Sequence, residues 1–340
     1  MKNTKILTER QQFPMVDIIK FICALLVVAI HISPVSSYSD NGVIYKYMYY
    51  GIKYYVTRIA VPFYFAASGF FFCRKINFET VDMLVIKNYI FKLLRFLGVW
   101  TILLFAGGTY HLWYIGGLVA AVCLFSVMLY KKVPLYLMVI IAIILYIIGL
   151  MGDPYYGLLC HLQKYKILGY LINEYFAIFT TTRNGIFMGF PFFLLGGIIA
   201  KKKICIKPCY AIFGFLLSMG LLFCEAVFLK VRAWPKDVNM YIFLVPAVFF
   251  LLLFSVNVSV RPRSIYKKMR NVGVIVYFSH LFVYQLILWG FEFTNKFFNI
   301  KIENSLIYYF LTIIIATALG AVIDELSQNK KFRFLKYLYS

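Results

Sequence analysis

Ten long apolar segments, separated by short polar connections, follow one another along this chain of 340 residues. A helix of about 20 apolar residues matches the thickness of the hydrocarbon core of a bilayer, so such segments are typical of membrane-spanning helices. The pattern therefore predicts an all-α fold, a polytopic bundle of about ten transmembrane helices. The predicted spans are residues 15–33, 52–73, 86–106, 111–130, 134–151, 174–200, 206–229, 239–258, 272–291 and 304–323.

Composition and charge agree with this class. The chain is 63% hydrophobic and 14% charged, with a mean hydropathy of +0.82, whereas about a quarter of the residues of a soluble domain are charged. The net charge of +22 could indicate a nucleic-acid partner, but most Lys and Arg residues gather on alternate connections, beginning with Lys2, Lys5 and Arg10. Positive residues mark the cytoplasmic side of membrane proteins. We therefore expect a multi-pass protein of the cell membrane with both termini cytoplasmic and no nucleic-acid partner.

The connections indicate one membrane-embedded domain over residues 1–340, which ends in a short cytoplasmic tail, 324–340. The first apolar segment is too long for a cleavable signal and should remain as an anchor. The connection 152–173, predicted to lie outside, is rich in Gly, Tyr and Leu, and we expect it to fold back as a lid or re-entrant piece. The seven Cys residues lack zinc-like spacing, so we expect neither a metal site nor a structural disulfide.

The first span carries one acidic residue, one lysine and one histidine, namely Asp17, Lys20 and His31. At about 100° per residue they fall within roughly 60° of one another, so a single helix face carries all three. A charge in hydrocarbon costs about 3 kcal/mol, and such residues usually face a protein interior and mark a working site. The alternative is that Asp17 and Lys20 reach the interface and that His31 caps the outer end.

Other polar residues gather near the outer ends or the middle of later spans. A Trp at this depth can also be an ordinary interfacial residue, and an intramembrane His can bond a backbone carbonyl. The candidates for a site are Arg58, Ser68, His111, Trp113, Arg183, Asn184 and His280.

These residues stand in an ordered set of motifs. Asp17-x-x-Lys20 followed by His31, Arg58-x-x-x-Pro62 running to Ser68-Gly69, His111-Leu112-Trp113-Tyr114, and Tyr277-Phe278-Ser279-His280 together resemble the acyltransferase 3 family of membrane enzymes. Gly152-Asp153, Thr182-Arg183-Asn184-Gly185 and Met240-Tyr241 are similar to the membrane half of the vancomycin-resistance serine racemases. The resemblance covers essentially the whole chain. We expect no soluble racemase domain here, and therefore neither racemase activity nor pyridoxal phosphate.

The resemblance implies transfer of an acyl group, usually acetyl, from cytoplasmic acetyl-CoA to an acceptor at or beyond the outer face. The protein would then be an acyltransferase of groups other than aminoacyl groups, an O-acetyltransferase. Its acceptor would be a glycan of the cell envelope or a small molecule. A base must take a proton from the attacking hydroxyl or amine, and His has a suitable intrinsic pKa. We predict His31 as this base, with Asp17 and Lys20 positioning each other and the donor.

The outer residues Arg58, His111, Trp113, Arg183 and Asn184 are then candidates for acceptor binding or oxyanion stabilisation. Ser68, Asp153 and His280 are further candidates for binding the acceptor or the donor. Two other functions stay open. The bundle could transport an amino acid such as serine, or it could anchor a separately encoded racemase. The sequence lacks the paired Gly- and Pro-interrupted spans of inverted-repeat transporters, which favours the enzyme.

Overall fold

The computed structural model describes residues 12–76, 81–104, 110–178, 181–298 and 303–340. Every regular element within these ranges is helical, so the all-α prediction is confirmed. The basic N-terminal residues Lys2, Lys5 and Arg10, and positions 105–106 of the third predicted span, lie outside them.

The elements follow one another in chain order. They are α1 (Pro14–Ile32), η1 (Ser36–Tyr38), α2 (Val43–Tyr54), η2 (Val56–Ile59), α3 (Ala60–Cys73), α4 (Met83–Leu103), η3 (Tyr110–Leu112), α5 (Trp113–Tyr130), α6 (Leu135–Met151), α7 (Tyr156–Leu162), α8 (Lys166–Ile178), the π-helix η4 (Gly185–Gly189), α9 (Phe190–Lys202), α10 (Pro208–Val231), α11 (Leu244–Asn257), α12 (Ser264–Phe298), α13 (Ser305–Leu326) and η5 (Lys330–Leu338).

Local chemistry sets several helix ends. Pro14 opens α1, where its missing N–H and fixed φ cost nothing. The helix stops at Ser33, whose φ of 52° lies in the left-handed region. The side chains of Asp82 and Asn304 accept hydrogen bonds from the first free amides of α4 and α13. These signals are readable in the sequence, and helices begin close to where they occur.

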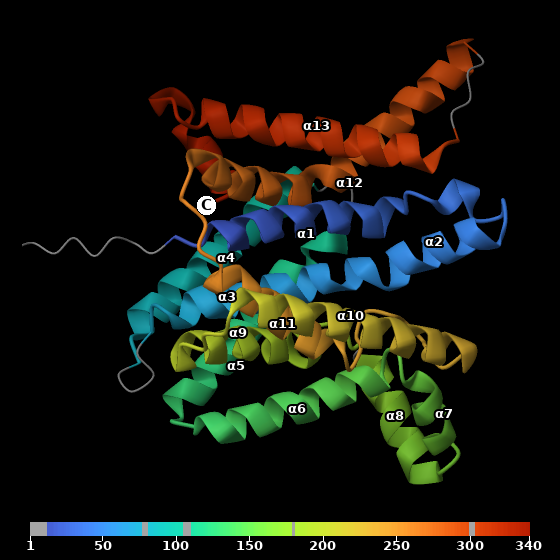
Figure 1. The fold of residues 1–340 in the computed structure, drawn as a ribbon, viewed down its shortest axis with the longest axis vertical. Helices are drawn as coiled ribbons and strands as arrows, with labels where there is room; N and C mark the ends of the chain where they lie inside the picture. Colours follow the sequence, from blue (N-terminus) through green and yellow to red (C-terminus); the bar gives the residue numbers. More distant parts are fainter. Residues whose placement is uncertain (1–11, 77–80, 105–109, 179–180, 299–302) are drawn as a thin grey trace, which may run out of the picture.

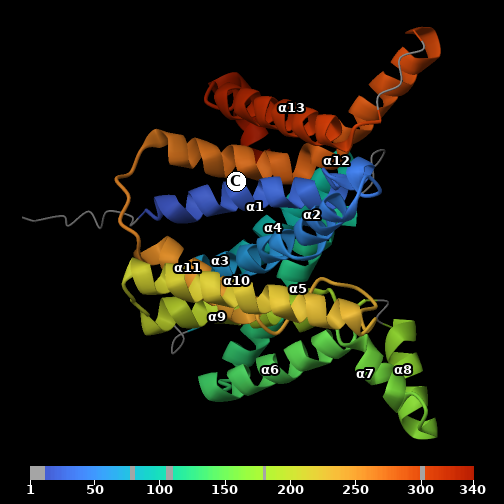
Figure 2. The ribbon, with the colours of Figure 1, turned by 45° about the vertical axis from the view of Figure 1, so that its right-hand side comes forward.

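Figures 1 and 2 show most helices running side by side along one direction. α12 and α13 form one edge of the bundle and α6 the opposite edge, with α7 and α8 at one end of α6. The beginning of α1 and the C-terminus lie at the same end of the bundle (Figure 1). We name the two ends after residues of α1. Its first turns lie at the Asp17 end, and its last turn lies at the His31 end.

The chain is a multi-pass membrane protein. Seven helical segments of the described residues are long and apolar enough to cross a membrane, or up to eight if α6 and α7, bent by 83°, form one span. The count of ten spans stays a prediction. It also includes α4, which carries Lys87, Lys92 and Arg95, and the 14-residue α11.

One boundary prediction was wrong, and the structure refines two others. The predicted span 174–200 is not one helix, because α8 ends at Ile178 and the helix resumes only with η4 at Gly185. The predicted loop 152–173 consists largely of the short helix α7 and most of α8. The predicted span 272–291 belongs to the much longer α12 of 35 residues. At 1.5 Å per residue, α12 is about 52 Å long and exceeds the hydrocarbon core of about 30 Å.

Glycines allow a very close contact between α3 and α9. A Cβ atom built on Gly69 would lie 1.9 Å from the Phe193 carbonyl oxygen, and one on Gly196 would lie 1.8 Å from the Ala66 carbonyl oxygen. Small residues let helix backbones approach in this way. The contact matters for the site, because α3 follows Arg58 and α9 follows the segment that carries Arg183 and Asn184.

Candidate active site

A small cavity of about 70 Å³ lies at the His31 end of α1. We call it the histidine cavity. It gathers residues from six stretches of the chain, and four of the predicted site side chains besides His31 line it. Its lining comprises Val27, Ile30, His31, Thr57, Arg58, Val61, Pro62, His111, Trp113, Arg183, Met188, Asn239 and Tyr277.

Three histidine rings meet beside this cavity. The ring centroids of His31 and His280 are 5.2 Å apart, those of His111 and His280 are 5.2 Å apart, and those of His31 and His111 are 6.5 Å apart. His280 and His111 are buried, whereas the side chain of His31 is exposed. The sequence places these residues on three separate segments, and only the fold brings them together.

Backbone carbonyls of α12 orient two of the three rings. His111 Nε2 lies 2.9 Å from the Phe278 carbonyl oxygen, and His280 Nδ1 lies 2.7 Å from the Tyr277 carbonyl oxygen. A carbonyl oxygen only accepts, so these nitrogens carry the protons of the neutral rings. His111 Nδ1 and His280 Nε2 are then lone-pair acceptors, and neither has a hydrogen-bond partner among the residues that the structure describes. The carbonyl contact considered for His280 is present, but it uses only one of its two nitrogens.

Arginine side chains line the other side of the histidine cavity and converge on one amide. Arg58 Nη1 donates to Asn239 Oδ1 over 2.8 Å, and Arg183 Nη1 donates to the same oxygen over 3.3 Å. Asn239 in turn donates from its backbone N to Asp153 Oδ1 over 2.9 Å and from Nδ2 to Asp153 Oδ2 over 3.1 Å. The guanidinium of Arg183 also lies 5.1 Å from the centre of the Trp113 ring.

Asn239 is a site residue that sequence reasoning missed. It stands at the first position of a predicted span, directly after a polar connection, and a lone Asn there carries no specific signal. Asp153 was predicted as a binding residue. In the structure it is buried and accepts two hydrogen bonds from Asn239, and these hold the side-chain amide that the arginines contact. Asn184 accepts from the Ile186 and Phe187 amides and so caps η4. It therefore positions the start of η4, beside Arg183.

A second polar cavity, of about 410 Å³, lies toward the Asp17 end, and we call it the cationic cavity. Lys20, Lys92 and Arg270 line it together with Ser68, whose Oγ lies 3.3 Å from Tyr114 Oη. Asp17 forms an ion pair with Arg270 over 3.8 Å. The lining of the cationic cavity comprises Lys20, Tyr64, Ser68, Tyr89, Lys92, Leu93, Phe96, Tyr114, Ile115, Leu118, Arg270, Asn271, Gly273, Val274, Tyr277, Phe278, Tyr339 and Ser340.

The two cavities share one residue, Tyr277, which lines both. Its hydroxyl donates to the His111 carbonyl oxygen over 3.2 Å. Lys20 and His31, predicted on one helix face, therefore open into different cavities on either side of Tyr277. The C-terminal residues Tyr339 and Ser340 also line the cationic cavity, and Trp100 Nε1 donates to the Leu338 carbonyl oxygen over 3.1 Å. The tail 324–340 is thus packed against the bundle.

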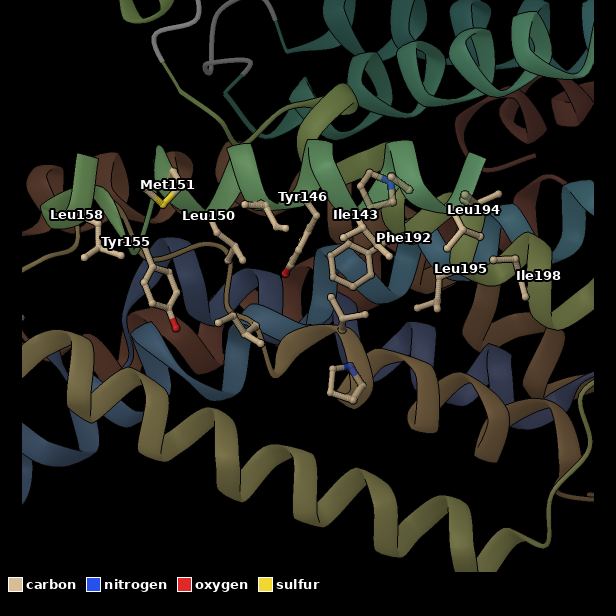
Figure 3. A pocket seen from close by; sticks show the side chains of 17 residues that line it. Ile143, Tyr146, Leu150, Met151, Tyr155, Leu158, Phe192, Leu194, Leu195 and Ile198 are labelled. Carbon is tan, nitrogen blue, oxygen red and sulfur yellow. The ribbon is translucent and has the colours of Figure 1, made fainter. Parts of the chain in front are cut away.

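A larger cavity of about 720 Å³ lies between α6, α9 and α11. Figure 3 shows Ile143, Phe192, Leu195 and other apolar side chains around it. Its lining holds neither a charged residue nor a histidine. It suits hydrocarbon, not an acid-base reaction, and it is not the candidate site. Among the described residues no three His, Cys, Asp or Glu side chains are placed to hold a metal ion together, and a metal-free site stays a prediction.

Comparison with known proteins settles the family. The acyltransferase domain known as acyltransferase 3 matches residues 14–325, nearly the whole chain. The chain belongs to this family. Membership supports a membrane acyltransferase, and the histidine and cationic cavities of this family member are its candidate active site.

Curated relatives of this acyltransferase 3 protein carry racemase names. An amino-acid racemase of Enterococcus faecalis is 30% identical over 95% of this chain and 47% of its own length. A serine/alanine racemase of Enterococcus gallinarum is 29% identical over 88% of this chain and 44% of its own length. The chain therefore spans about half the length of the curated relatives it matches. No solved structure matches it.

Proposed function

We propose that this protein transfers an acyl group, which we take to be acetyl, from acyl-CoA on the cytoplasmic side to a hydroxyl or amine of an acceptor on the outer side. The observation that carries this proposal is the meeting of two unlike polar cavities at Tyr277. One is lined by cations, and the other is lined by histidines and arginines. In this proposal the bundle is one domain of ten spans, its Asp17 end and both termini are cytoplasmic, and its His31 end faces outward.

The cationic cavity supports the donor half of the proposal. Acyl-CoA carries phosphates, and lysine and arginine side chains are the usual partners of phosphate groups. Lys20, Lys92 and Arg270 place three such cations on one cavity, with Asp17 holding Arg270 in place. The thioester end of the donor would point toward Tyr277 and the histidine cavity. Lys92 and Arg270 are exposed like Lys87, and positive-inside topology accounts for exposed cations at this end. The support for a donor site is that Lys92 and Arg270 line one cavity together with the partly buried Lys20.

The histidine cavity supports the chemical half. His31 takes the proton of the acceptor's hydroxyl or amine as the acceptor's oxygen or nitrogen attacks the thioester carbon. The carbon–sulfur bond then breaks, and the CoA thiolate leaves and receives that proton. The unpartnered lone pairs of His280 Nε2 and His111 Nδ1 lie on rings next to His31, so they can accept hydrogen bonds from the protonated His31 during the transfer. Arg58 and Arg183 supply donors for the negative oxygen of the tetrahedral intermediate.

The racemase names of the relatives leave one second candidate open, transport of an amino acid such as serine, with or without a separately encoded racemase as partner. The same charged groups could bind a zwitterion near the middle of the membrane. Such a protein would move serine and leave acyl-CoA intact.

A test uses purified protein in nanodiscs with acetyl-CoA labelled in the acetyl group and a crude envelope fraction as acceptor. We compare wild type with His31→Ala and with His161→Ala, which removes an exposed histidine of α7 outside both cavities. We expect His31→Ala to bind the donor and lose at least about 10²-fold in label transfer, as loss of a general base does, while His161→Ala matches wild type. Donor left intact by wild type, with serine accumulating in wild-type vesicles, would establish transport instead.

A further inference from the structure

Another hollow lies between α2, the end of α10 and residues 233–238. The start of α2 and the end of α10 lie at the His31 end of the bundle (Figure 1). The hollow measures about 760 Å³, and we call it the tyrosine groove. Five tyrosines and two lysines stand among the residues that line it. They are Tyr47, Tyr50, Gly51, Tyr54, Tyr55, Phe223, Ala226, Val227, Lys230, Val231, Ala233, Pro235, Lys236, Asp237, Val238 and Tyr241.

The spacing of the tyrosines gives the groove one aromatic wall. Tyr47, Tyr50 and Tyr54 lie at positions i, i+3 and i+7 of α2, so they share one helix face. The Tyr50 and Tyr54 rings stack with centroids 5.5 Å apart and 28° between their planes. The negative faces of such rings attract the weakly positive C–H groups of sugars and polyols. Interfacial tyrosines occur in many membrane proteins, but these ones line a hollow next to the histidine cavity.

The lysines of the groove rest on aromatic rings and not on carboxylates. Lys230 Nζ lies 2.9 Å from the centre of the Tyr50 ring, and Lys236 Nζ lies 3.7 Å from the centre of the Phe176 ring. Within the described part of the chain neither lysine forms an ion pair. The groove contains one acidic side chain, Asp237, whose Oδ1 accepts from the Val238 amide over 2.9 Å. Two cations against one carboxylate leave the groove positive, which suits an anionic ligand.

The groove adjoins the histidine cavity directly. Val238 lines the groove, and the next residue, Asn239, lines the histidine cavity. Tyr54 belongs to the groove wall. Its ring lies 5.9 Å from the Arg58 guanidinium carbon, and its carbonyl oxygen accepts from Tyr241 Oη over 2.8 Å. A chain-like ligand in the groove would therefore have one end beside Arg58 and Asn239.

We propose that the tyrosine groove binds the acceptor, and that the acceptor is a chain of sugar or polyol units bearing anionic groups such as phosphate. This inference rests on the proposed function. The aromatic wall would select the sugar or polyol units and the lysines the charge. Because Val238 and Asn239 are consecutive residues of the two hollows, a ligand end at Val238 would bring a hydroxyl toward the histidine cavity and His31. A phospholipid headgroup shares the phosphate chemistry and is the other source that an experiment must separate.

The test measures binding without any acyl donor, with the protein in nanodiscs of phosphatidylcholine. The probes are a fluorescent oligomer of glycerol phosphate and a neutral dextran of equal length. The variant Lys230→Gln with Lys236→Gln removes the two groove cations. Lys164→Gln with Lys166→Gln removes two exposed charges near the start of α8, outside the groove, and serves as the matched control.

We expect the glycerol phosphate oligomer to bind wild type and the control equally, and the groove variant about tenfold more weakly, because two charge-assisted contacts are lost. We expect dextran to bind wild type at least about tenfold more weakly than the oligomer, for the same reason. Equal binding of the oligomer by the groove variant and the control would overturn the inference. Loss of oligomer binding when the protein is reconstituted in discs that contain phosphatidylglycerol would also overturn it, because the groove would then hold a lipid headgroup.

Label transfer separates failure of this inference from failure of the proposed function. Acetyl transfer to dextran as fast as to the glycerol phosphate oligomer would leave the acyltransferase standing and refute the anionic acceptor. Lysine-dependent binding of the oligomer, with no acetyl transfer to any acceptor, would refute the acyltransferase and leave the groove as an anion-binding site.

Discussion

Replacement of Gly196 by Ala should damage both the stability and the activity of this protein. The new Cβ would lie 1.8 Å from the Ala66 carbonyl oxygen and 2.9 Å from the Phe70 amide nitrogen. Real Cβ atoms stay at least 3.0 Å from such neighbours, so the backbones of α3 and α9 must part by about 1.2 Å or more. Overpacking of a well-packed contact costs about 1–3 kcal/mol of folding free energy, and sometimes more.

The same movement should reach the site. Arg58 stands just before α3, and Arg183 stands just before η4 and α9, so parting these helices separates the two guanidinium groups from their shared acceptor on Asn239. A misplacement of about 1 Å can cost about 10²-fold in rate. We therefore expect Gly196→Ala to lower both the midpoint of thermal unfolding in detergent and the rate of CoA release.

Gly220→Ala is the matched control, because a Cβ at Gly220 has nothing within 4 Å. Gly220 lies inside α10, where Ala is favoured over Gly by about 0.5–1 kcal/mol, so this variant should be as stable as wild type or slightly more stable. If Gly196→Ala unfolds at the same temperature as Gly220→Ala and releases CoA at the same rate, the close contact of α3 and α9 is not as described.

Three further substitutions test the contacts of the two cavities and of the bundle. Asn239→Ala removes the oxygen that both arginines contact. Each of these hydrogen bonds is worth about 1.5–3 kcal/mol, so the variant should lower kcat/KM about 10²-fold. The control Asn304→Ala uncaps α13 and should lower only thermal stability. Glu225→Ala leaves the amides of Ile242 and Phe243 without their acceptor and should lower the free energy of unfolding by about 2–5 kcal/mol. Glu225→Gln keeps one carbonyl oxygen as an acceptor, so its free energy of unfolding should fall clearly less. Lys92→Gln should raise KM for acetyl-CoA about threefold to tenfold with kcat unchanged, because the exposed charge-assisted bond from Lys92 to a CoA phosphate is lost. Lys87 lies outside the cationic cavity. An equal rise in KM from Lys87→Gln would show that the positive surface as a whole attracts the donor.

Much of the fold was predictable from the sequence because bilayer physics imposes a strong pattern. Apolar length and helix-end residues such as Pro14 and Asn304 mark the helices directly. The errors arose where a break in the helix depends on tertiary contacts. The interruption before Gly185 is set by Asn184, which caps η4, and by the packing of Gly185 against Gly117. A hydropathy pattern reports neither contact. The sequence did indicate that the chain turns back after residue 151, but not that the following segment forms the helices α7 and α8.

The site was predictable as a list of residues but not as a geometry. Polar side chains in apolar segments identified His31, Arg58, His111 and Arg183, which the fold places on one cavity. The spacing along α1 could not reveal that Lys20 and His31 open into separate cavities, because Tyr277 of α12 lies between those cavities. Nor could it assign partners. Asp17 pairs with Arg270, and Asp153 holds Asn239, through contacts between segments far apart in the sequence.

The most direct test of acyl transfer across the membrane uses the protein reconstituted in one orientation into sealed liposomes. Labelled acetyl-CoA is added only on the side of the Asp17 end, and the envelope acceptor only on the side of the His31 end. Transfer between two separate cavities that meet at Tyr277 predicts labelled acceptor on the far side and free CoA on the donor side, both abolished by His31→Ala. Label that reaches acceptor only when donor and acceptor share one side would contradict it.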